Sequence, residues 1–287
     1  MSEQSTGSPK VSVLITSYNR AAYIGETIES VLKQTFTDYE IVISDNCSTD
    51  NTMEVLARYA NNPRIRIHRN ERNIGQFPNR NMCASLARGT YLKYLDSDDL
   101  IYPWGLELLV RMMDEHPEAG WGLCSLVQIA ERPYPFLLNP REAYHYHYHV
   151  FGIFDKAPLS SIIRKSTFDK VGGFSDIRMA GDFDMWQKLA KRSPVLLMPD
   201  GIVWNRVHVG QEMSHFDKYV LQYEEVRIKY LSDPECPMDV STRKQIIRDI
   251  KRKSLREVFT SLLRLRFGAA ARKFRIFNFY FRQRIPN

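Results

Sequence analysis

Short apolar runs bounded by polar turns recur in the first third of the chain and predict β-strands. They lie at residues 11–15, 40–44, 64–67 and 91–95. Their starts are roughly 25–30 residues apart, which is the spacing of strand–helix units in a parallel sheet. Alternating polarity at 64–67 predicts that this strand lies at the edge of the sheet.

Helical periodicity fills the segments between these runs. Apolar residues recur at helical spacing in two stripes: Ile24, Ile28, Val31 and Leu32, and Leu106, Leu109, Val110 and Met113. Residues 48–50 supply a polar N-cap for a helix near Met53, and Pro117 closes the second stripe. The first 120 residues therefore predict an alternating α/β unit.

The pattern changes after about residue 130. Residues 131–148 contain three prolines and many aromatic side chains, which predicts an irregular connection. After it we expect a strand at 160–163, a helical turn at 166–171, a helix at 182–191, and helices from 216 onward with a break at 232–237 and a basic amphipathic stretch at 242–266. His145, His147 and His149 would share one face of a strand and suggest a metal site, but an exposed loop is the favoured interpretation.

Composition narrows the class of protein. Hydrophobic residues make up 44% and charged residues 25% of the chain, as in ordinary globular proteins. No apolar run is long enough for a transmembrane helix, and the polar N-terminus lacks the apolar core of a secretory signal. These features predict a cytoplasmic protein. Four scattered cysteines, with no closely spaced pair, predict free thiols rather than a disulfide framework or a zinc site.

Charge is distributed unevenly along the chain. Residues 241–287 hold 14 Lys and Arg against 2 Asp and Glu, a balance of +12, whereas the whole chain carries +7. Such asymmetry predicts an anionic partner: nucleic acid, acidic lipid or acidic protein. Aromatic residues interleave with cations at 272–284, which favours the surface of an anionic membrane. A solvated helical appendage is the alternative interpretation.

The densest chemical signal is an acidic cluster that ends the fourth predicted strand. Asp96, Asp98 and Asp99 place three carboxylates within four residues, with Ser97 between them. The carboxyl edge of an α/β sheet is where ligands bind, and close carboxylates need a compensating cation. Mg²⁺ or Mn²⁺ suits oxygen ligands of this kind, while a solvated helix N-cap is the alternative.

Two further loops follow predicted strands. Asp45 comes directly after the second strand, where a carboxylate can accept hydrogen bonds from a base or a ribose. Thr16, Tyr18 and Asn19 follow the first strand and offer small polar groups and one aromatic ring for a base pocket. Taken alone, the loop at Asp45 is also explained as a capped turn, and the loop after the first strand is only a loop.

The combination of three segments is more specific than its parts. VSVLITSYNR, YEIVISDNCSTDNT and NIGQFPNRNMCASLARGTYLKYLDSDD, in this order and spacing, resemble the family 2 glycosyltransferases. The resemblance is close over residues 9–110 and looser to about 215. It implies a GT-A fold, an α/β architecture with a mixed, mostly parallel sheet flanked by helices. It also implies inverting sugar transfer from a nucleoside diphosphate sugar, with UDP as the default nucleotide, assisted by Mn²⁺ or Mg²⁺.

The resemblance also implies roles for individual residues. The nucleotide-sugar would contact Thr16, Tyr18, Asn19, Asp45, Arg80, Asp96 and Ser97. Asp98 and His208 would bind the metal, and Asp99 would cap the next helix or support the site. His208 and Ser214 match a loop that closes over the diphosphate.

Asp182 matches the catalytic general base of the family's Glu-Asp-x-Asp-Leu-Trp motif, although Gly181 stands where the glutamate is usual. A carboxylate of this kind takes the proton of the acceptor hydroxyl during attack. Without the resemblance, a helix N-cap would be the favoured interpretation of Asp182.

These expectations divide the chain into a flexible N-terminus (1–9), a GT-A unit (10–215) and a helical, basic C-terminal extension (216–287). Within the GT-A unit, residues 10–120 would bind the nucleotide-sugar and residues 121–215 the acceptor, a glycan or a polyprenol-linked glycan. The basic residues 241–287 would contact the inner face of the plasma membrane. Two rivals are a nucleotidyltransferase, which lacks its usual glycine-rich loop here, and a non-catalytic nucleotide-sugar or nucleic-acid binding protein; nucleic acid is the less favoured partner.

Overall fold

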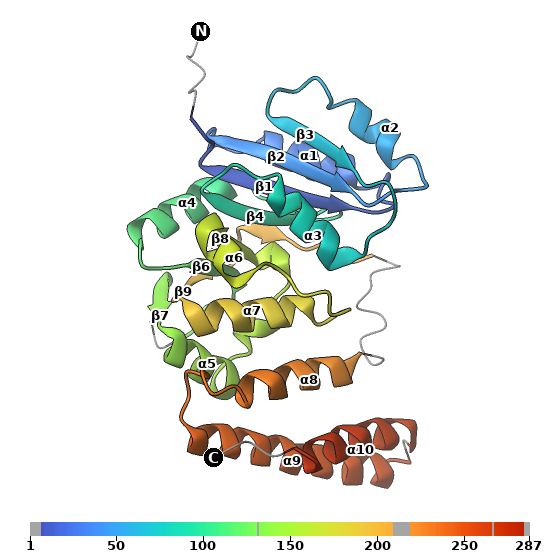
Figure 1. Cartoon of the computed structure of the whole chain (residues 1–287), viewed down its shortest axis with the longest axis vertical. Helices are drawn as coiled ribbons and strands as arrows, with labels where there is room; N and C mark the ends of the chain where they lie inside the picture. The colour runs from blue at the N-terminus through green and yellow to red at the C-terminus, as the bar shows by residue number, and fades with distance from the viewer. Residues whose placement is uncertain (1–6, 131, 209–218, 266, 284–287) are drawn as a thin grey trace.

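The computed structural model describes residues 7–130, 132–208, 219–265 and 267–283. Its centre is an eight-stranded sheet with the order β3-β2-β1-β4-β8-β6-β9-β7 (Figure 1). The four strands predicted in the first third are all present: β1 Val11–Ser17, β2 Tyr39–Asp45, β3 Ile65–Arg69 and β4 Tyr91–Asp96. They pair in parallel, and β3 lies at the sheet edge as its alternating polarity predicted.

The second half of the sheet is mixed. β8 pairs antiparallel with both β4 and β6, β6 pairs parallel with β9, and β7 pairs antiparallel with β9. Their bounds are β6 Trp121–Leu126, β7 Phe136–Leu138, β8 Ser161–Arg164 and β9 Val195–Pro199. A separate two-stranded ribbon joins β5 Leu100–Ile101 to β10 Val203–Trp204. This ribbon brings the segment after β10 back to the acidic cluster at the end of β4.

Helices cover both faces of the sheet because successive residues of a buried strand point to opposite sides. Leu14 and Val42 face one layer, built mainly from α3, α5, α6 and α7. Val13 and Ile41 face the other, built mainly from α1, α2 and α4. The bounds are α1 Ile24–Leu32, α2 Thr52–Ala57, α3 Gln76–Ser85, α4 Gly105–Glu115, α5 Pro140–His149, α6 Lys165–Val171 and α7 Gly181–Arg192, with short 3₁₀ helices η1 Ile153–Asp155 and η2 Pro158–Ser160.

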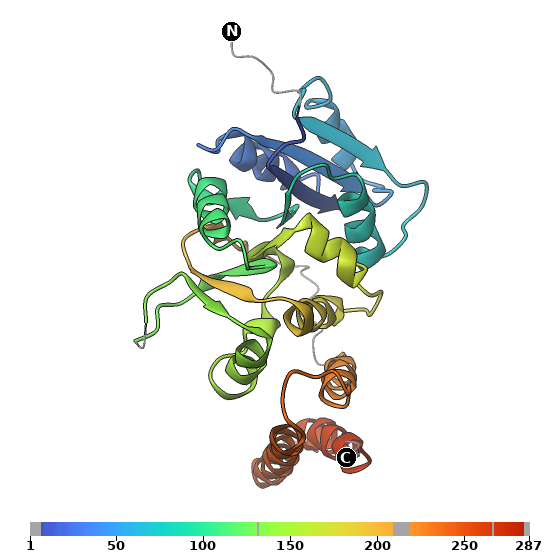
Figure 2. The ribbon, with the colours of Figure 1, turned by 60° about the vertical axis from the view of Figure 1, so that its left-hand side comes forward.

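Three helices complete the described chain: α8 Val220–Leu231, α9 Val240–Leu263 and α10 Phe267–Phe281. The α9 and α10 helices pack against each other beyond α8, at the opposite end of the molecule from the N-terminus (Figures 1 and 2). Tyr280 of α10 is fully buried and donates its hydroxyl hydrogen to Glu224 of α8. None of the helices described here is long and apolar enough to cross a membrane.

The expectation of an irregular connection at 131–148 is wrong, because that segment contains β7 and most of α5. Helix α5 begins with a capping box: Asn139 accepts from the Glu142 N–H, and the Glu142 carboxylate accepts from the Asn139 N–H. Pro140 occupies the first helical turn, where its missing N–H costs nothing. The prolines that suggested a loop therefore include one that starts a helix.

The three histidines lie on α5 and share neither a strand face nor an exposed loop, so both interpretations of them are wrong. His147 is buried, and its Nδ1 accepts from the Phe154 N–H, whereas His145 and His149 are exposed. A smaller correction concerns α2. Its N-cap residue is Asn51, while the side chain of Asp50 accepts from the Thr52 N–H.

Candidate active site

The register of the parallel strands brings three loops together at one edge of the sheet. Thr16 of β1 lies opposite Asp96 of β4, and Ser17 of β1 lies opposite Asp45 of β2. The carboxyl ends of parallel strands therefore meet here, as the strand pattern predicted. Tyr18 follows directly, with 43% of its surface exposed, so its ring is available to a ligand.

Hydrogen bonds join the loop after β1 to the loop after β2. Asn19 has a left-handed backbone (φ 53°), a conformation that asparagine tolerates better than most residues. Its N–H donates to Ser48 Oγ at 2.9 Å, and its Oδ1 accepts from the Thr49 N–H at 2.8 Å. The loop that was expected to hold a nucleoside is thus held in one conformation before any ligand arrives.

Asp45 is fully buried at the end of β2. Its Oδ1 accepts from the Ser48 N–H at 2.9 Å and lies 3.8 Å from Arg69 Nε, and its Oδ2 accepts from the Ser48 hydroxyl. The carboxylate therefore shapes its own loop in this structure. Its expected contact with a base stays a prediction.

Arg80 connects α3 to the acidic cluster. It is buried, and its Nη2 donates to Asp96 Oδ1 at 2.5 Å. Burial alone would lower the pKa of the guanidinium, but the Asp96 charge outweighs burial and raises it, so Arg80 stays cationic. Its Nε and Nη1 are buried without a hydrogen-bond partner among the described residues. Two unused charged donors beside the acidic cluster suit an anionic ligand.

Asp98 contacts side chains from two distant parts of the sequence. Its Oδ2 lies 3.0 Å from Arg20 Nε and 3.0 Å from His208 Nε2. The His208 ring in turn lies 4.7 Å from the Tyr23 ring. Asp98 and His208, both expected as metal ligands, are therefore adjacent although 110 residues separate them.

Mg²⁺ and Mn²⁺ prefer oxygen ligands and accept imidazole nitrogen. Asp98 and His208, whose Oδ2 and Nε2 are hydrogen-bonded to each other at 3.0 Å, are the residues that would hold such an ion. No group of three or more His, Cys, Asp or Glu side chains placed to hold a metal occurs in the described ranges. The residues present thus fit an ion that takes its remaining ligands from phosphate oxygens and water.

Asp99 supports the site rather than capping a helix. The chain continues from it into β5, and α4 begins only at Gly105, so the expected cap is wrong. The Asp99 carboxylate accepts from the Arg206 N–H at 2.8 Å and faces the Asn205 side chain. Burial and the neighbouring Asp96 charge raise its pKa to about 7. Asp99 therefore holds the segment that carries His208.

Asp182 lies in the first turn of α7, and its Oδ1 accepts from its neighbour's N–H, that of Phe183, at 2.8 Å. Ala180 is the N-cap residue, so Asp182 is not a helix cap. Burial raises the pKa of Asp182 to about 6, and the charges of Arg80 and Asp96 also act on it. The expected base is thus close enough to Arg80 and to the acidic cluster for their charges to act on it.

Gly181 has a structural explanation. A Cβ at this position would lie 2.6–2.7 Å from three ring carbons of Phe77, closer than real Cβ contacts occur. Phe77 is buried in α3 and stacks on Phe174 with ring centroids 5.7 Å apart. An aromatic ring therefore fills the space that a side chain at 181 would need, which accounts for the missing glutamate of the motif.

Several residues of the site were missed from the sequence. Arg20 contacts Asp98, and Arg206 Nε donates to the Asp98 carbonyl at 2.8 Å. Arg20 directly follows Asn19 in the quoted segment VSVLITSYNR, so its position after the strand was an available signal. Ser214, expected beside His208, lies outside the described residues.

Comparison with known proteins identifies the class. Residues 12–172, more than half of the chain, match the sequence profile of the family described as Glycosyl transferase family 2. In fold, the chain resembles Staphylococcus aureus TarS 1-349 in complex with UDP-GlcNAc: TM-score 0.64, 22% identity, covering 83% of this chain and 70% of that one. The chain therefore has the GT-A fold and belongs to glycosyl transferase family 2.

Other relatives agree over shorter stretches. A Pasteurella multocida chondroitin synthase is 43% identical over 104 residues, which cover 36% of this chain and 11% of that protein. The poly(ribitol-phosphate) beta-N-acetylglucosaminyltransferase TarS of S. aureus is 36% identical over 110 residues, covering 37% of this chain and 19% of that protein. The mannosyltransferase PcManGT of Pyrobaculum calidifontis, in complex with GDP-Man and Mn²⁺, matches in fold with a TM-score of 0.59 and 17% identity, over 94% of this chain and 86% of that one. The chain spans less than a fifth of the length of the two sequence relatives.

Proposed function

We propose that this protein is an inverting glycosyltransferase that moves a sugar from a nucleoside diphosphate sugar to a hydroxyl of a glycan or lipid-linked glycan. One observation carries the proposal. The charges of Arg80 and Asp96 both act on the Asp182 carboxyl, and Arg80 is itself ion-paired to Asp96 of the acidic cluster. A candidate base and a candidate diphosphate site, 86 residues apart in sequence, therefore lie within electrostatic range of each other.

The chemistry follows from the charges. Negative charge grows on the leaving diphosphate as the glycosidic bond breaks, and the buried guanidinium of Arg80 is placed to stabilise it. A divalent cation held by Asp98 and His208 would neutralise the same charge. An acceptor hydroxyl is a poor nucleophile near neutral pH, and ionised Asp182 can take its proton during attack. Attack opposite the leaving group inverts the anomeric centre.

UDP is the nucleotide we propose for the donor. Two considerations support it: the default of the family that the sequence resembles, and the UDP-GlcNAc complex of a protein with the same fold. GDP is the competing choice, since PcManGT is described in complex with GDP-Man and Mn²⁺. Mn²⁺ or Mg²⁺ is the proposed cofactor, because Asp98 and His208 bring an oxygen and a nitrogen ligand together and PcManGT is described with Mn²⁺.

A thermal-shift panel tests the proposal directly. UDP, GDP, dTDP and CMP are each added with Mn²⁺, Mg²⁺ or EDTA, because a ligand of the native state raises Tm according to its saturation. We expect a rise with UDP that needs the divalent cation and disappears in EDTA. The variant Asp98→Asn should lose most of the metal-dependent rise.

A matched variant makes the panel specific. Asp169→Asn removes a carboxylate that is exposed on α6 and, among the described residues, pairs only with Lys165 of its own helix, so its shifts should equal those of the parent protein. If folded protein shows no shift with any nucleotide and metal, the donor site is wrong. A full UDP shift in EDTA would overturn the role of the cation alone.

A further inference from the structure

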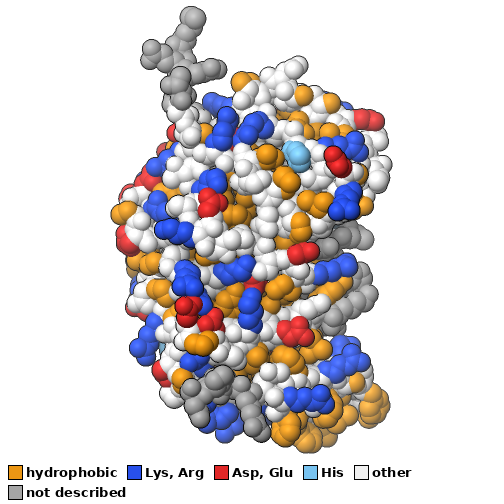
Figure 3. Space-filling model, in the orientation of Figure 1, with side chains coloured by type: hydrophobic (Ala, Val, Ile, Leu, Met, Phe, Trp, Pro, Cys, Tyr) orange, Lys and Arg blue, Asp and Glu red, His pale blue; other side chains and the backbone are white. Residues whose placement is uncertain are grey.

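Exposed apolar side chains gather at the end of the molecule formed by α9 and α10. Half of the exposed large hydrophobic residues in the described chain, eight of sixteen, lie between residues 255 and 281. The most exposed are Leu263 at 85%, Leu265 at 75% and Phe281 at 70%. Figure 3 shows hydrophobic side chains beside Lys and Arg at this end. We call Leu255, Phe259, Leu262, Leu263, Leu265 and Phe267 the α9–α10 apolar patch.

The spacing of these residues shows that α9 has two apolar faces. Its buried side contains Ile246, Ile247 and Val258, which pack toward the rest of the protein. The patch residues 255, 259, 262 and 263 follow the i, i+4, i+7, i+8 pattern of a second face. Among the residues that the structure describes, only the first face is covered.

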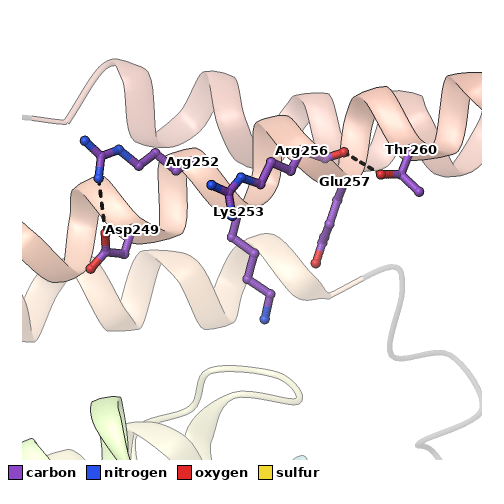
Figure 4. Close-up of a pocket in the computed structure, with 6 residues that line it drawn as sticks. All are labelled: Asp249, Arg252, Lys253, Arg256, Glu257 and Thr260. Carbon is purple, nitrogen blue, oxygen red and sulfur yellow. Dashed lines mark hydrogen bonds and ion pairs between the residues drawn. The ribbon is translucent and has the colours of Figure 1, made fainter.

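Cations accompany the second face. Arg252 and Arg256 lie three residues before Leu255 and Phe259, so they border the same side of α9. Figure 4 shows both arginines with Lys253 around a pocket on this helix, together with Asp249 and Glu257. Those two carboxylates already have partners: Asp249 lies 3.9 Å from Arg252, and Glu257 lies 2.8 Å from Lys273 of α10. The positive charge therefore prevails.

We propose that the α9–α10 apolar patch inserts into the headgroup region of an anionic lipid bilayer, with the flanking arginines contacting lipid phosphates. Apolar side chains next to cations are the composition that such surfaces select. A second copy of the chain is a poorer occupant, because a symmetric interface would bring two positively charged faces together. The net charge of +12 over residues 241–287 also favours contact with an anionic surface.

The structure moves this contact relative to the one expected from the sequence. Of the apolar residues at 272–283, Ile276 and Tyr280 are buried and hold α10 to the body of the protein, whereas Phe274 and Phe281 are exposed. We place the insertion at the end of α9 and the start of α10, where six of the eight exposed residues lie. In Figure 1 these lie on the side of the molecule toward which β1 and β2 point, the side of the candidate active site.

Vesicle sedimentation tests the proposal with the full chain. Sucrose-loaded vesicles are made of phosphatidylcholine alone or with one third phosphatidylglycerol. We expect binding to the anionic vesicles that weakens at high salt. The double variant Leu263→Glu/Leu265→Glu should reduce this binding by about tenfold or more, because two leucines that would enter the bilayer are lost and two negative charges are added.

Val127→Glu/Val150→Glu is the matched control. These valines are 61% and 60% exposed and lie outside the helical pair, so this variant should bind as the parent does. Circular dichroism confirms that both variants are folded. Absence of binding by the parent, or equal binding by both double variants, would overturn the proposal. So would a dimer, seen by light scattering, that the leucine variant abolishes without any change in vesicle binding. None of these readouts depends on sugar transfer.

Discussion

At the residue scale, two neighbours at the start of α7 have opposite requirements. Gly181 has no room for a side chain because Phe77 occupies the space, whereas Asp182 needs its carboxylate for the role that we propose for it. The first is a packing constraint and the second an electrostatic one. Separate substitutions can distinguish them.

Replacement Gly181→Ala should destabilise the protein by about 1–3 kcal/mol, because the new methyl group overlaps the Phe77 ring. Chemical denaturation gives the free energy of unfolding. Adding Phe77→Leu should recover part of the loss. Gly268→Ala is the control, since nothing lies within 4 Å of its Cβ position in α10 and it should be neutral or stabilising. Equal effects of the two alanines would contradict the packing argument.

Replacement Asp182→Asn should lower turnover by about 10²–10⁴-fold while leaving donor binding in place. In the parent, turnover should rise with pH through about 6, where the Asp182 carboxyl of the free protein ionises. Initial rates across pH and nucleotide titration check both points. Near-normal turnover of the variant would remove Asp182 from the mechanism.

The same pKa has a consequence for stability. A carboxyl whose pKa is raised from 3.8 to about 6 by folding favours the native state below pH 3.8, and this advantage is lost as pH rises through 6. Asp182→Asn should therefore raise Tm at pH 8 by about 2–4 °C for each kcal/mol regained, with a smaller difference at pH 4. Melting curves of parent and variant at the two pH values test this. A Tm difference that does not change with pH would argue against the raised pKa of Asp182.

At the element scale, α7 is the part of the fold that connects the chemistry to the C-terminal helices. Asp184 lies two residues after the candidate base and is fully buried. It accepts from Lys229 at 2.8 Å and Tyr230 at 3.1 Å, both on α8, and from Ser175 at 2.7 Å. The two acidic residues of α7 thus differ in their surroundings. Asp182 is the candidate base, and Asp184 binds α8.

Replacement Asp184→Asn should destabilise the protein at pH 7 by about 1–3 kcal/mol, because charged hydrogen bonds to α8 are lost. Burial alone would raise the pKa of Asp184, but Lys229 and Ser175 outweigh it and lower it. The stability from this carboxylate is therefore present above pH 3.8 and is lost as pH falls below it. Chemical denaturation should show a large difference in the free energy of unfolding between parent and variant at pH 7 and a small one at pH 3. A larger difference at pH 3 would contradict this argument.

At the scale of the whole molecule, one apolar core extends from the sheet to the last helix. Residues of β4, α7, α8, α9 and α10 belong to the same cluster of buried side chains. Tyr280 and Glu224 add a buried polar contact between α10 and α8. The division at residue 215 expected from the sequence stays a prediction about function, since packing continues across it.

A shared core predicts one cooperative unfolding transition. Near-ultraviolet dichroism reports the stacked Trp121–Trp186 pair between β6 and α7, and far-ultraviolet dichroism reports all helices. The two urea unfolding curves should coincide. Tyr280→Phe should lower the free energy of unfolding measured by both signals by about 1–3 kcal/mol, because buried Glu224 loses a hydrogen-bond donor. A separate early transition in the far-ultraviolet signal would show that α9 and α10 unfold alone.

Local patterns by themselves determined the four parallel strands, their intervening helices and the acidic cluster at a strand end. The reason is that apolar runs, caps and turn residues act over a few positions. The capping box at Asn139 was equally local but was obscured by the surrounding prolines. The class of protein was also readable, because the residues that carry it follow strand ends in a fixed order.

Only the tertiary structure decided which distant groups meet. It placed Asp182 within range of the charges of Arg80 and Asp96, His208 beside Asp98, and Phe77 against Gly181. It also decided which of the aromatic residues near the C-terminus are buried and which lie in the α9–α10 apolar patch. Such contacts join positions about a hundred residues apart, so they depend on strand order and helix packing, which no local pattern encodes.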